Sequence, residues 1–299
     1  KGIFGPPLGK QCVIFVDDLN MPQLETYGAQ PPVELLRQWM DHQGWYDRKT
    51  TTFRTLVDIS YVAAMGPPGG GRNPVTPRFV RHFDLINLTE FDTSTLSRIF
   101  VTILDWFFKR FSPKIKQLAQ PLVLATVSLY REISQELLPT PTKSHYTFNL
   151  RDLSKVFQGV MQISEKKFED SNEVLRLWIH EASRVFRDRL VEEADHTVFL
   201  NIIDKSLQEQ FKMKISDVCK DDLLMFGDFM TPDAEESFYA HVDDPNKLQT
   251  VMETYLEDYN ALAAQPMNLV LFRSAMEHIA RVVRVLRQPF GHCLLAGVG

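Results

Sequence analysis

The stretch that most constrains the fold of this chain is an apolar run that ends in two adjacent carboxylates. Residues 12–16 read CVIFV, and Asp17 and Asp18 follow directly. An apolar run of this length, rich in β-branched residues and holding a Phe, predicts a buried strand of a parallel sheet. Ligands of open α/β sheets collect at the carboxyl ends of the strands, so both acids are candidate site residues.

An acidic pair after a strand admits two interpretations. In P-loop nucleoside triphosphatases, the first acid holds Mg²⁺, usually through water, and the second orients or deprotonates the attacking water. Equally, many buried strands end in an acidic turn, and Asp17 would also serve to cap a following helix. The pair alone does not decide between these interpretations, so the flanking sequence has to.

Composition and charge exclude several classes of protein. The chain has 299 residues, 44% of them hydrophobic, which allows two domains or one domain with a helical appendage. A formal net charge of −5 gives nucleic-acid binding no electrostatic support, and no apolar run approaches the roughly 20 residues of a membrane span. The three scattered cysteines lack metal or disulfide spacing, which is typical of a reducing, cytoplasmic environment.

Both ends of the chain suggest a piece of a longer protein. It opens without a methionine, and residues 290–299 read as an apolar strand running into the first glycines of a phosphate-binding loop. A second glycine-rich stretch, residues 5–11 (GPPLGKQ), is one residue short of a P-loop and directly precedes the apolar run. There is no room for the helix and strand that should intervene, so we expect a turn there.

The first ninety residues alternate between predicted strands and a helix. Residues 33–40 carry an apolar face at helical spacing, a turn is expected at 44–47, and the polar residues up to Arg54 predict an exposed connection. Further along, the sequence predicts a second buried strand at 56–65, an irregular glycine-rich loop at 66–74, a short helix or turn at 77–82 and a third strand at 83–88. This order is typical of an α/β fold with a parallel sheet.

From Asp92 onward the pattern is helical, so the predicted fold class is α/β followed by all-α. Residues 172–194 predict one long helix with an exposed charged face, because Glu181, Arg184, Asp188 and Glu192 recur mostly at a spacing of four. Two more helices are expected at 247–262 and 268–286. The row formed by Arg281, Arg284 and Arg287 could attract an anion, but a second solvated face is the preferred interpretation.

A series of short motifs resembles axonemal dynein heavy chains. The motifs are FVDDLNMP at 15–22, YGAQPP at 27–32, LRQW at 36–39, MGPPGGGRN at 65–73 and PRFVRH at 77–82. They fall in the order of the third AAA+ module of that motor's ring, and FNLRDLS at 148–154 is similar to the module's helical lid. The resemblance implies three parts: residues 1–91 from an AAA+ P-loop core, residues 92–243 as its lid, and residues 244–299 as the entry to the fourth module.

The resemblance also implies roles for single residues. Asp17 matches the acid that holds Mg²⁺ through water, and Asp18 matches the acid that positions water. Arg78 and Arg81 occupy the arginine-finger region, where one guanidinium contacts the nucleotide of a neighbouring module. Arg151 matches the sensor-II arginine of the lid, which contacts the module's own ATP or ADP; the alternative is that Arg151 only stabilises a helix start.

Two departures from the family's pattern indicate slow hydrolysis. A catalytic AAA+ site usually has Glu at the position of Asp18, which is one methylene shorter. The sensor-I position falls near Met65, which cannot hydrogen-bond a phosphate, and Asn73 is the candidate substitute. With its Walker A loop expected upstream, the chain alone is predicted to be inactive. The prediction is a regulatory nucleotide-binding module; an active ATPase site and a purely structural ring spacer are the alternatives.

For the whole protein, the resemblance implies an ATP-driven microtubule motor of the ciliary or flagellar axoneme. Its expected partners are neighbouring AAA+ modules of the same chain, microtubules bound through other parts of the protein, and dynein intermediate and light chains. No nucleic-acid or membrane partner is expected.

Overall fold

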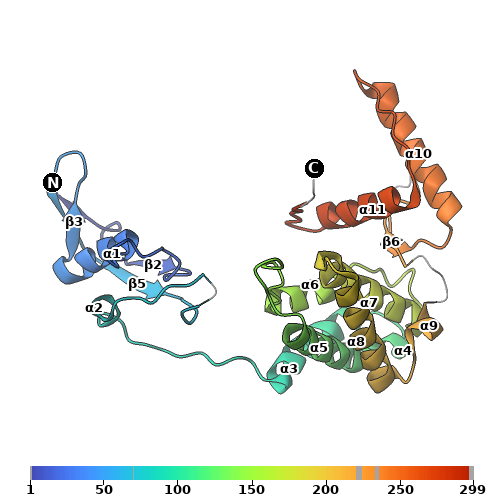
Figure 1. Ribbon diagram of the computed structural model, residues 1–299, viewed down its shortest axis with the longest axis horizontal. Helices are drawn as coiled ribbons and strands as arrows, with labels where there is room; N and C mark the ends of the chain where they lie inside the picture. Colours follow the sequence, from blue (N-terminus) through green and yellow to red (C-terminus); the bar gives the residue numbers. More distant parts are fainter. Residues whose placement is uncertain (1, 70, 220–223, 233–235, 296–299) are drawn as a thin grey trace. The chain divides into compact units, whose positions relative to one another are not determined.

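The computed structural model describes residues 2–69, 71–219, 224–232 and 236–295, and it divides the chain into two compact units. Residues 1–89 form an α/β unit, and residues 90–299 form a mainly helical unit (Figure 1). The predicted fold class, α/β followed by all-α, is confirmed. Among the described residues, no helix combines the length and apolar character needed to cross a membrane.

The α/β unit contains two small sheets and two helices. Strand β2 pairs in parallel with β5, so that Cys12 lies opposite Ile59 and Val16 opposite Ala63. The second sheet has the order β1-β4-β3, with β1 and β4 parallel and β3 and β4 antiparallel. The elements are β1 (Ile3–Phe4), β2 (Cys12–Val16), α1 (Pro31–His42), β3 (Gly44–Tyr46), β4 (Phe53–Leu56), β5 (Ile59–Ala63) and α2 (Pro77–Val80).

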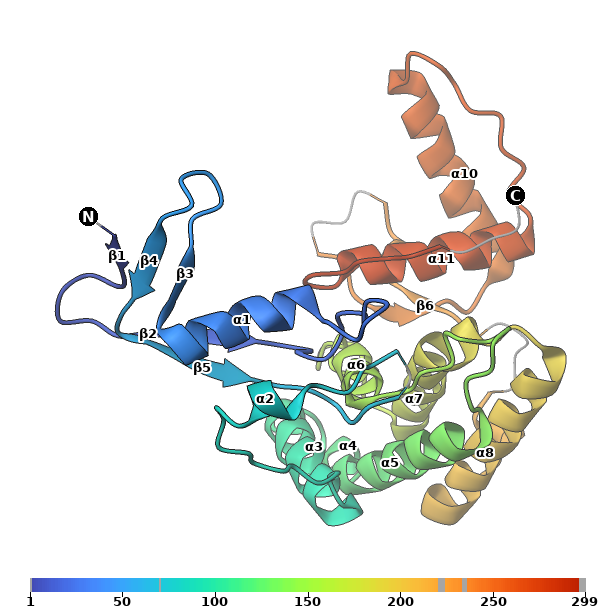
Figure 2. The ribbon, with the colours of Figure 1, turned by 60° about the vertical axis from the view of Figure 1, so that its left-hand side comes forward.

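Helix α1 covers one face of the β2–β5 pair, and the other face stays open. Val33 and Phe79 form a small core with Leu19, and residues of both strands pack against it. Figure 2 shows α1 lying alongside the β2–β5 pair. Trp39 of α1 packs edge-on against Tyr61 of β5, with 4.8 Å between ring centroids. On β2, by contrast, Val13 is 64% exposed and Phe15 61% exposed. The prediction of a fully buried β2 is therefore wrong: the strand alternates, with one face covered and one open.

Three further expectations for this unit are wrong. The predicted strand at 56–65 is divided at Asp58, whose φ of 54° is left-handed, so its start belongs to β4 and the rest forms β5. The expected turn and connection at 44–54 contain the hairpin strands β3 and β4. Residues 83–88 form no strand, because this segment finds no neighbouring strand among the described residues to complete its backbone hydrogen bonds.

The helical unit packs its first eight helices around one large core. Trp178, fully buried, donates from Nε1 to Thr126 Oγ1 over 2.9 Å, and Phe100 stacks on Phe157 with 4.4 Å between centroids. The elements that build this core are α3 (Thr93–Phe108), α4 (Pro113–Lys116), α5 (Ala119–Glu136), α6 (Leu150–Val160), α7 (Ser171–Val185), the 3-10 turn η1 (Arg187–Arg189), α8 (Glu193–Phe211) and α9 (Ile215–Val218).

A second, smaller core joins the last two helices to the rest of the unit. Its members include Met225, Val242, Leu248 and Met276. The elements here are β6 (Phe226–Gly227), β7 (Ala240–His241), α10 (Pro245–Leu262) and α11 (Arg273–Arg287). The two predicted final helices are confirmed. The predicted terminal strand is not found over residues 291–295, and residues 296–299 lie outside the described part.

The charged faces predicted for this unit are wrong at Glu181 and Arg284, whereas Glu192 and Arg287 are exposed as expected. Residues 172–194 are divided into α7, η1 and the start of α8, because Phe186 and Leu190 turn the chain into the core. Glu181, expected on an exposed face, is fully buried at 0% exposure, and Arg284, expected on a solvated row, is only 9% exposed. The two side chains pair with each other, which is why both tolerate burial.

Candidate functional site

The predicted site residues that follow β2 gather at one edge of the α/β unit. Because β2 and β5 are parallel neighbours, Asp17 and Asp18 leave the sheet at the same edge as the loop that follows Ala63. The backbone holds this edge together. Ala64 donates its N–H to Val16 O over 2.9 Å, and Leu19 donates to Ala64 O over 3.0 Å.

The two acids form a tight, solvent-exposed turn. Asp17 accepts the Asp18 N–H at Oδ1 over 3.0 Å, and Asp18 has a left-handed φ of 48°, which Asp tolerates better than most residues. The Asp18 carboxylate lies 3.4 Å from the Arg72 guanidinium. Both of these side chains are about half exposed, so the pair contributes at most about 1 kcal/mol. The acids are thus accessible to a ligand.

Asn20, which sequence reasoning missed, fastens the glycine-rich loop to this acidic turn. Its Nδ2 donates to Gly66 O over 2.8 Å, and its own carbonyl accepts the Asn73 N–H over 2.8 Å. Asn73 adds a third bond, from Nδ2 to Pro22 O over 2.9 Å. Asn20 is only 1% exposed, and its Oδ1 has no hydrogen-bond partner among the described residues. The only sequence signal was that Asn20 follows the acids by two residues.

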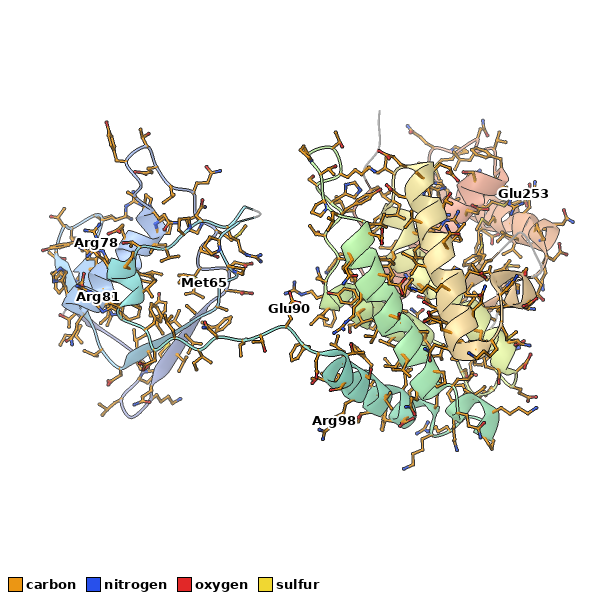
Figure 3. The ribbon with its side chains drawn as sticks, turned by 60° about the horizontal axis from the view of Figure 1, so that its bottom comes forward. Met65, Arg78, Arg81, Glu90, Arg98 and Glu253 are labelled. Carbon is orange, nitrogen blue, oxygen red and sulfur yellow. The ribbon has the colours of Figure 1, made fainter. Side chains whose placement is uncertain are left out.

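The two candidate finger arginines, Arg78 on α2 and Arg81 directly after it, differ in their contacts (Figure 3). Arg81 lies 2.6 Å from Asp41 Oδ1, and His82 Nε2 lies 2.9 Å from the same oxygen. The hydrogen bond from Arg81, chief among several contacts, lowers the pKa of Asp41 below its ordinary value. Arg78 is exposed and has no ion pair among the described residues. Arg81 is therefore held within its own unit, whereas Arg78 is available to a ligand.

Arg151 belongs to the helical unit, at the first turn of α6. Asn149 Oδ1 accepts the Arg151 N–H over 2.8 Å, and Asp152 Oδ2 accepts the Asn149 N–H over 3.1 Å. These two side chains cap the helix without help from the Arg151 guanidinium. A cation in this position opposes the helix dipole, so a helix-stabilising role has no support. The guanidinium itself is exposed.

Comparison with known proteins places these features in a family. Residues 1–91 match the model of the P-loop containing dynein motor region, residues 122–224 match the AAA+ lid domain, and residues 267–299 match the P-loop containing dynein motor region D4. Over the whole chain, it is 52% identical to dynein axonemal heavy chain 1 of Homo sapiens. This chain belongs to the axonemal dynein heavy-chain family.

Other axonemal dynein heavy chains match over the same full span. Identity is 47% to dynein axonemal heavy chain 3 of Homo sapiens and 45% to dynein axonemal heavy chain 12 of Rattus norvegicus. The chain spans 7%, 8% and 10%, respectively, of the length of the three relatives named here. The chain therefore corresponds to a small part of each of these heavy chains, and its matched regions fit a nucleotide-binding AAA+ module.

The glycine-rich residues 5–11 do not form the P-loop of this dynein segment. Lys10 donates its N–H to Pro7 O over 3.0 Å, which closes a turn, and β2 begins at Cys12 without an intervening helix. The expected turn is confirmed.

The acidic edge fits a metal that is held through water and phosphate. Within the described ranges, no group of three or more His, Cys, Asp or Glu side chains is placed to bind a metal ion by itself. Mg²⁺ in nucleotide sites is commonly bound by one or two carboxylates, with water and phosphate oxygens completing its octahedron. Asp17 and Asp18 supply the hard oxygen donors that such a site requires, at an exposed edge.

Proposed function

We propose that this chain is part of a regulatory nucleotide-binding AAA+ module in an axonemal dynein heavy chain. The observation that carries the proposal is the pair of exposed carboxylates at the carboxyl edge of β2, beside a loop fastened by Asn20. In this site Asp17 would hold Mg²⁺ through water, and the ion would offset the charge of the ATP or ADP phosphates. Asp18 would position water.

Slow hydrolysis follows from what surrounds Asp18. Its carboxylate is one methylene shorter than that of Glu, and part of its charge faces Arg72 at 3.4 Å. A water held at a poorer distance or angle reacts much more slowly, because small misplacements of reacting groups cost large factors in rate. The Asn73 amide, the candidate γ-phosphate sensor, already donates to Pro22 O and would have to give up that bond. Binding without rapid turnover is the expected behaviour.

Two arginines would complete sites formed with other parts of the protein. Arg78 is the better finger candidate, since Arg81 is engaged by Asp41 while Arg78 has no ion pair among the described residues. A guanidinium suits this task because it is always charged and can bridge two phosphate oxygens. Arg151, exposed at the start of α6, would act as the sensor arginine of the lid.

The whole protein would be an ATP-driven microtubule motor of the ciliary or flagellar axoneme. The support is that all of this chain aligns with axonemal heavy chains, at 52% and 47% identity to two of them. Its partners would be neighbouring AAA+ modules, microtubules, and dynein intermediate and light chains. The three-part division into residues 1–91, 92–243 and 244–299 is part of the same proposal.

Calorimetric titration of Mg-ATP and Mg-ADP tests the module's function. Two proteins are compared: this chain, and a version extended upstream until it includes the Walker A loop. We expect tight binding only by the extended protein, with turnover close to background, and loss of binding in Asp17→Asn. Asp84→Asn is the matched control, since Asp84 is an exposed acid of the same unit.

The alternatives predict different results. Rapid turnover by the extended protein that Asp18→Asn abolishes would show an active ATPase site. If the extended protein binds neither nucleotide, the module is a structural ring spacer. Binding by the short chain would overturn the assignment of residues 5–11 as a simple turn.

A further inference from the structure

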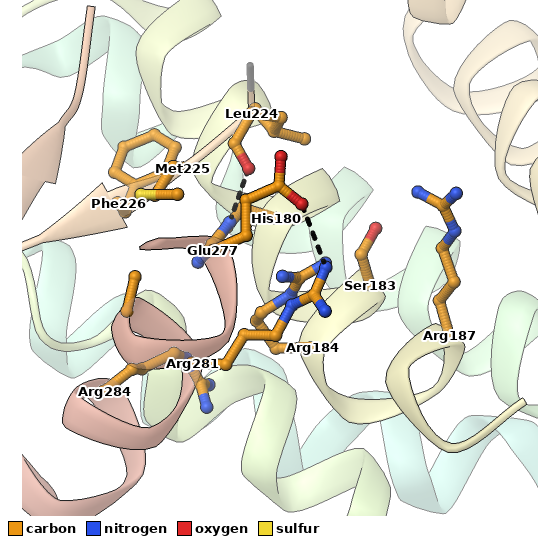
Figure 4. A pocket seen from close by; sticks show the side chains of 11 residues that line it. His180, Ser183, Arg184, Arg187, Leu224, Met225, Phe226, Glu277, Arg281 and Arg284 are labelled. Atoms are coloured by element: carbon orange, nitrogen blue, oxygen red, sulfur yellow. Dashed lines mark hydrogen bonds and ion pairs between the residues drawn. The ribbon is translucent and has the colours of Figure 1, made fainter. Parts of the chain in front are cut away.

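A cavity of about 120 Å³ lies in the helical unit between α7, η1, β6 and α11. Helix α7 supplies His180, Ser183 and Arg184, and α11 supplies Glu277, Arg281 and Arg284 (Figure 4). The remaining lining residues are Arg187, Leu224, Met225, Phe226 and Ala280. Four of the eleven lining residues are arginines, so the cavity is lined by several positive charges.

The carboxylates around this cavity do not balance its arginines. Glu181 is fully engaged, because Arg284 binds both of its oxygens and Tyr239 donates to Oε1 over 2.7 Å. Asp188 is shared, lying 3.1 Å from Arg184 and 3.7 Å from Arg281.

Glu277 lies 3.7 Å from Arg281 and also contacts Arg273 outside the cavity. Arg187 has no carboxylate partner among the described residues. With four guanidiniums against three carboxylates, one positive charge in excess faces the cavity.

Part of the positive charge around the cavity, that of Arg184, is poorly solvated. Burial lowers the pKa of Arg184, and Arg281, Arg284 and Arg187 lower it further, against the opposing effect of Asp188. An arginine nevertheless stays protonated in a protein, so the repulsion persists. The Nε atoms of Arg184 and Arg281 are buried and make no hydrogen bond to any residue that the structure describes.

His180 adds no charge. Burial, the largest cause, holds its pKa well below the ordinary value, and its Nδ1 faces the Leu224 carbonyl oxygen over 3.1 Å. A bound anion would give Arg187 an ion-pair partner and would offset the mutual repulsion of the neighbouring arginines.

We propose that this cavity binds a single phosphate group, held by Arg187 together with Arg184 and Arg281. Guanidinium forks match phosphate oxygens in geometry and charge, and the resulting hydrogen bonds are among the strongest in proteins. The volume is well below the roughly 300 Å³ at which sites for drug-sized ligands begin, so the cavity encloses a phosphate group and not a whole nucleotide. Free inorganic phosphate and a phosphate monoester share this chemistry. The inference does not rest on the proposed nucleotide site, which uses none of these residues.

The test is thermal unfolding and calorimetric titration of the full chain with sodium phosphate, at an ionic strength held constant with sodium chloride. Constant ionic strength removes general screening effects. We expect a saturable rise in melting temperature with phosphate, because a ligand that binds only the folded state stabilises it. A parallel titration with O-phosphoserine distinguishes the two sources: a monoester site binds it at least as well as phosphate, and a site for the free ion binds it less well.

Arg187→Gln is the decisive variant. Arg187 has no ion-pair partner in the described structure, so its removal leaves no carboxylate unpaired. Loss of one charged hydrogen-bond donor should weaken phosphate binding about tenfold. Arg98→Gln, an exposed arginine on α3 in the same unit, should bind phosphate unchanged. If Arg187→Gln does not fold, Arg187→Lys, which keeps the charge but loses the fork, carries the same expectation. Equal stabilisation by phosphate and chloride, or unchanged phosphate affinity in the Arg187 variant, would overturn the proposal.

Discussion

The buried pair between Glu181 and Arg284 allows a sharp test of what holds the last helix of this chain in place. The two side chains come from α7 and α11, and their exposures are 0% and 9%. Burial alone would lower the pKa of Arg284, but the Glu181 carboxylate outweighs that effect and leaves the pKa raised. Tyr239 donates to the same carboxylate, so the ion pair is also well hydrogen-bonded.

Removing one member should cost far more than removing both. Glu181→Leu leaves a buried, uncompensated guanidinium, and Arg284→Met leaves a buried carboxylate. Breaking a buried pair in this way typically costs 3–5 kcal/mol. Replacing both members with apolar residues of similar volume is often neutral or even stabilising. If the two single costs simply added, the double variant would be the least stable of the four proteins. We expect it instead to be several kcal/mol more stable than that sum predicts.

The assay is urea unfolding followed by far-UV circular dichroism for the parent, both single variants and the double variant. The double-mutant cycle isolates the coupling between the two side chains. Single-variant costs below about 1 kcal/mol, the range of an exposed pair, would refute the reasoning. So would a double variant whose cost equals the sum of the two single costs.

Three further predictions follow from contacts in the two units. His180 is kept neutral by burial, so its contribution to stability is present above its unfolded pKa of about 6.5 and is lost as the pH falls below that value; between pH 6.5 and 5 the unfolding free energy should drop by about 2 kcal/mol, at about 1.4 kcal/mol per pH unit, in the parent and in the exposed control His278→Gln, but not in His180→Asn. Gly159→Ala should destabilise α6 by about 1–3 kcal/mol in urea unfolding, because a Cβ there would overlap the Glu181 carboxylate; a gain, as helix propensity alone predicts, would contradict this contact. Asn20→Ala should cost about 1 kcal/mol in the unfolding of residues 1–89 by removing the bond to Gly66 O, and unchanged stability would show that the loop is held by other contacts.

The parts of the structure that could be predicted from sequence are those governed by local pattern. The run at 12–16 and the acids after it have a local signature, and so do the helices of the second unit. The roles of Asp17, Asp18, Asn73 and Arg151 stay predictions, because no ligand contact tests them.

The parts that could not be predicted depend on partners far away in the chain. Spacing of charges at four residues usually indicates an exposed helix face, but Glu181 finds its partner 103 residues away. The choice between Arg78 and Arg81 likewise depends on Asp41, forty residues upstream of Arg81. One signal was present: a glycine inside a helical pattern, as at Gly159, often marks a close approach of another element.

The open face of β2 has a practical consequence for anyone who prepares residues 1–89 by themselves. Val13 and Phe15 present a strip of apolar surface, and within the described ranges β2 is hydrogen-bonded to one strand, β5. A strand with an unpaired edge and an apolar face is a template for edge-to-edge association. Such a preparation should bind hydrophobic dyes and grow into oligomers as its concentration rises, and a charged substitution such as Val13→Lys should keep it monodisperse.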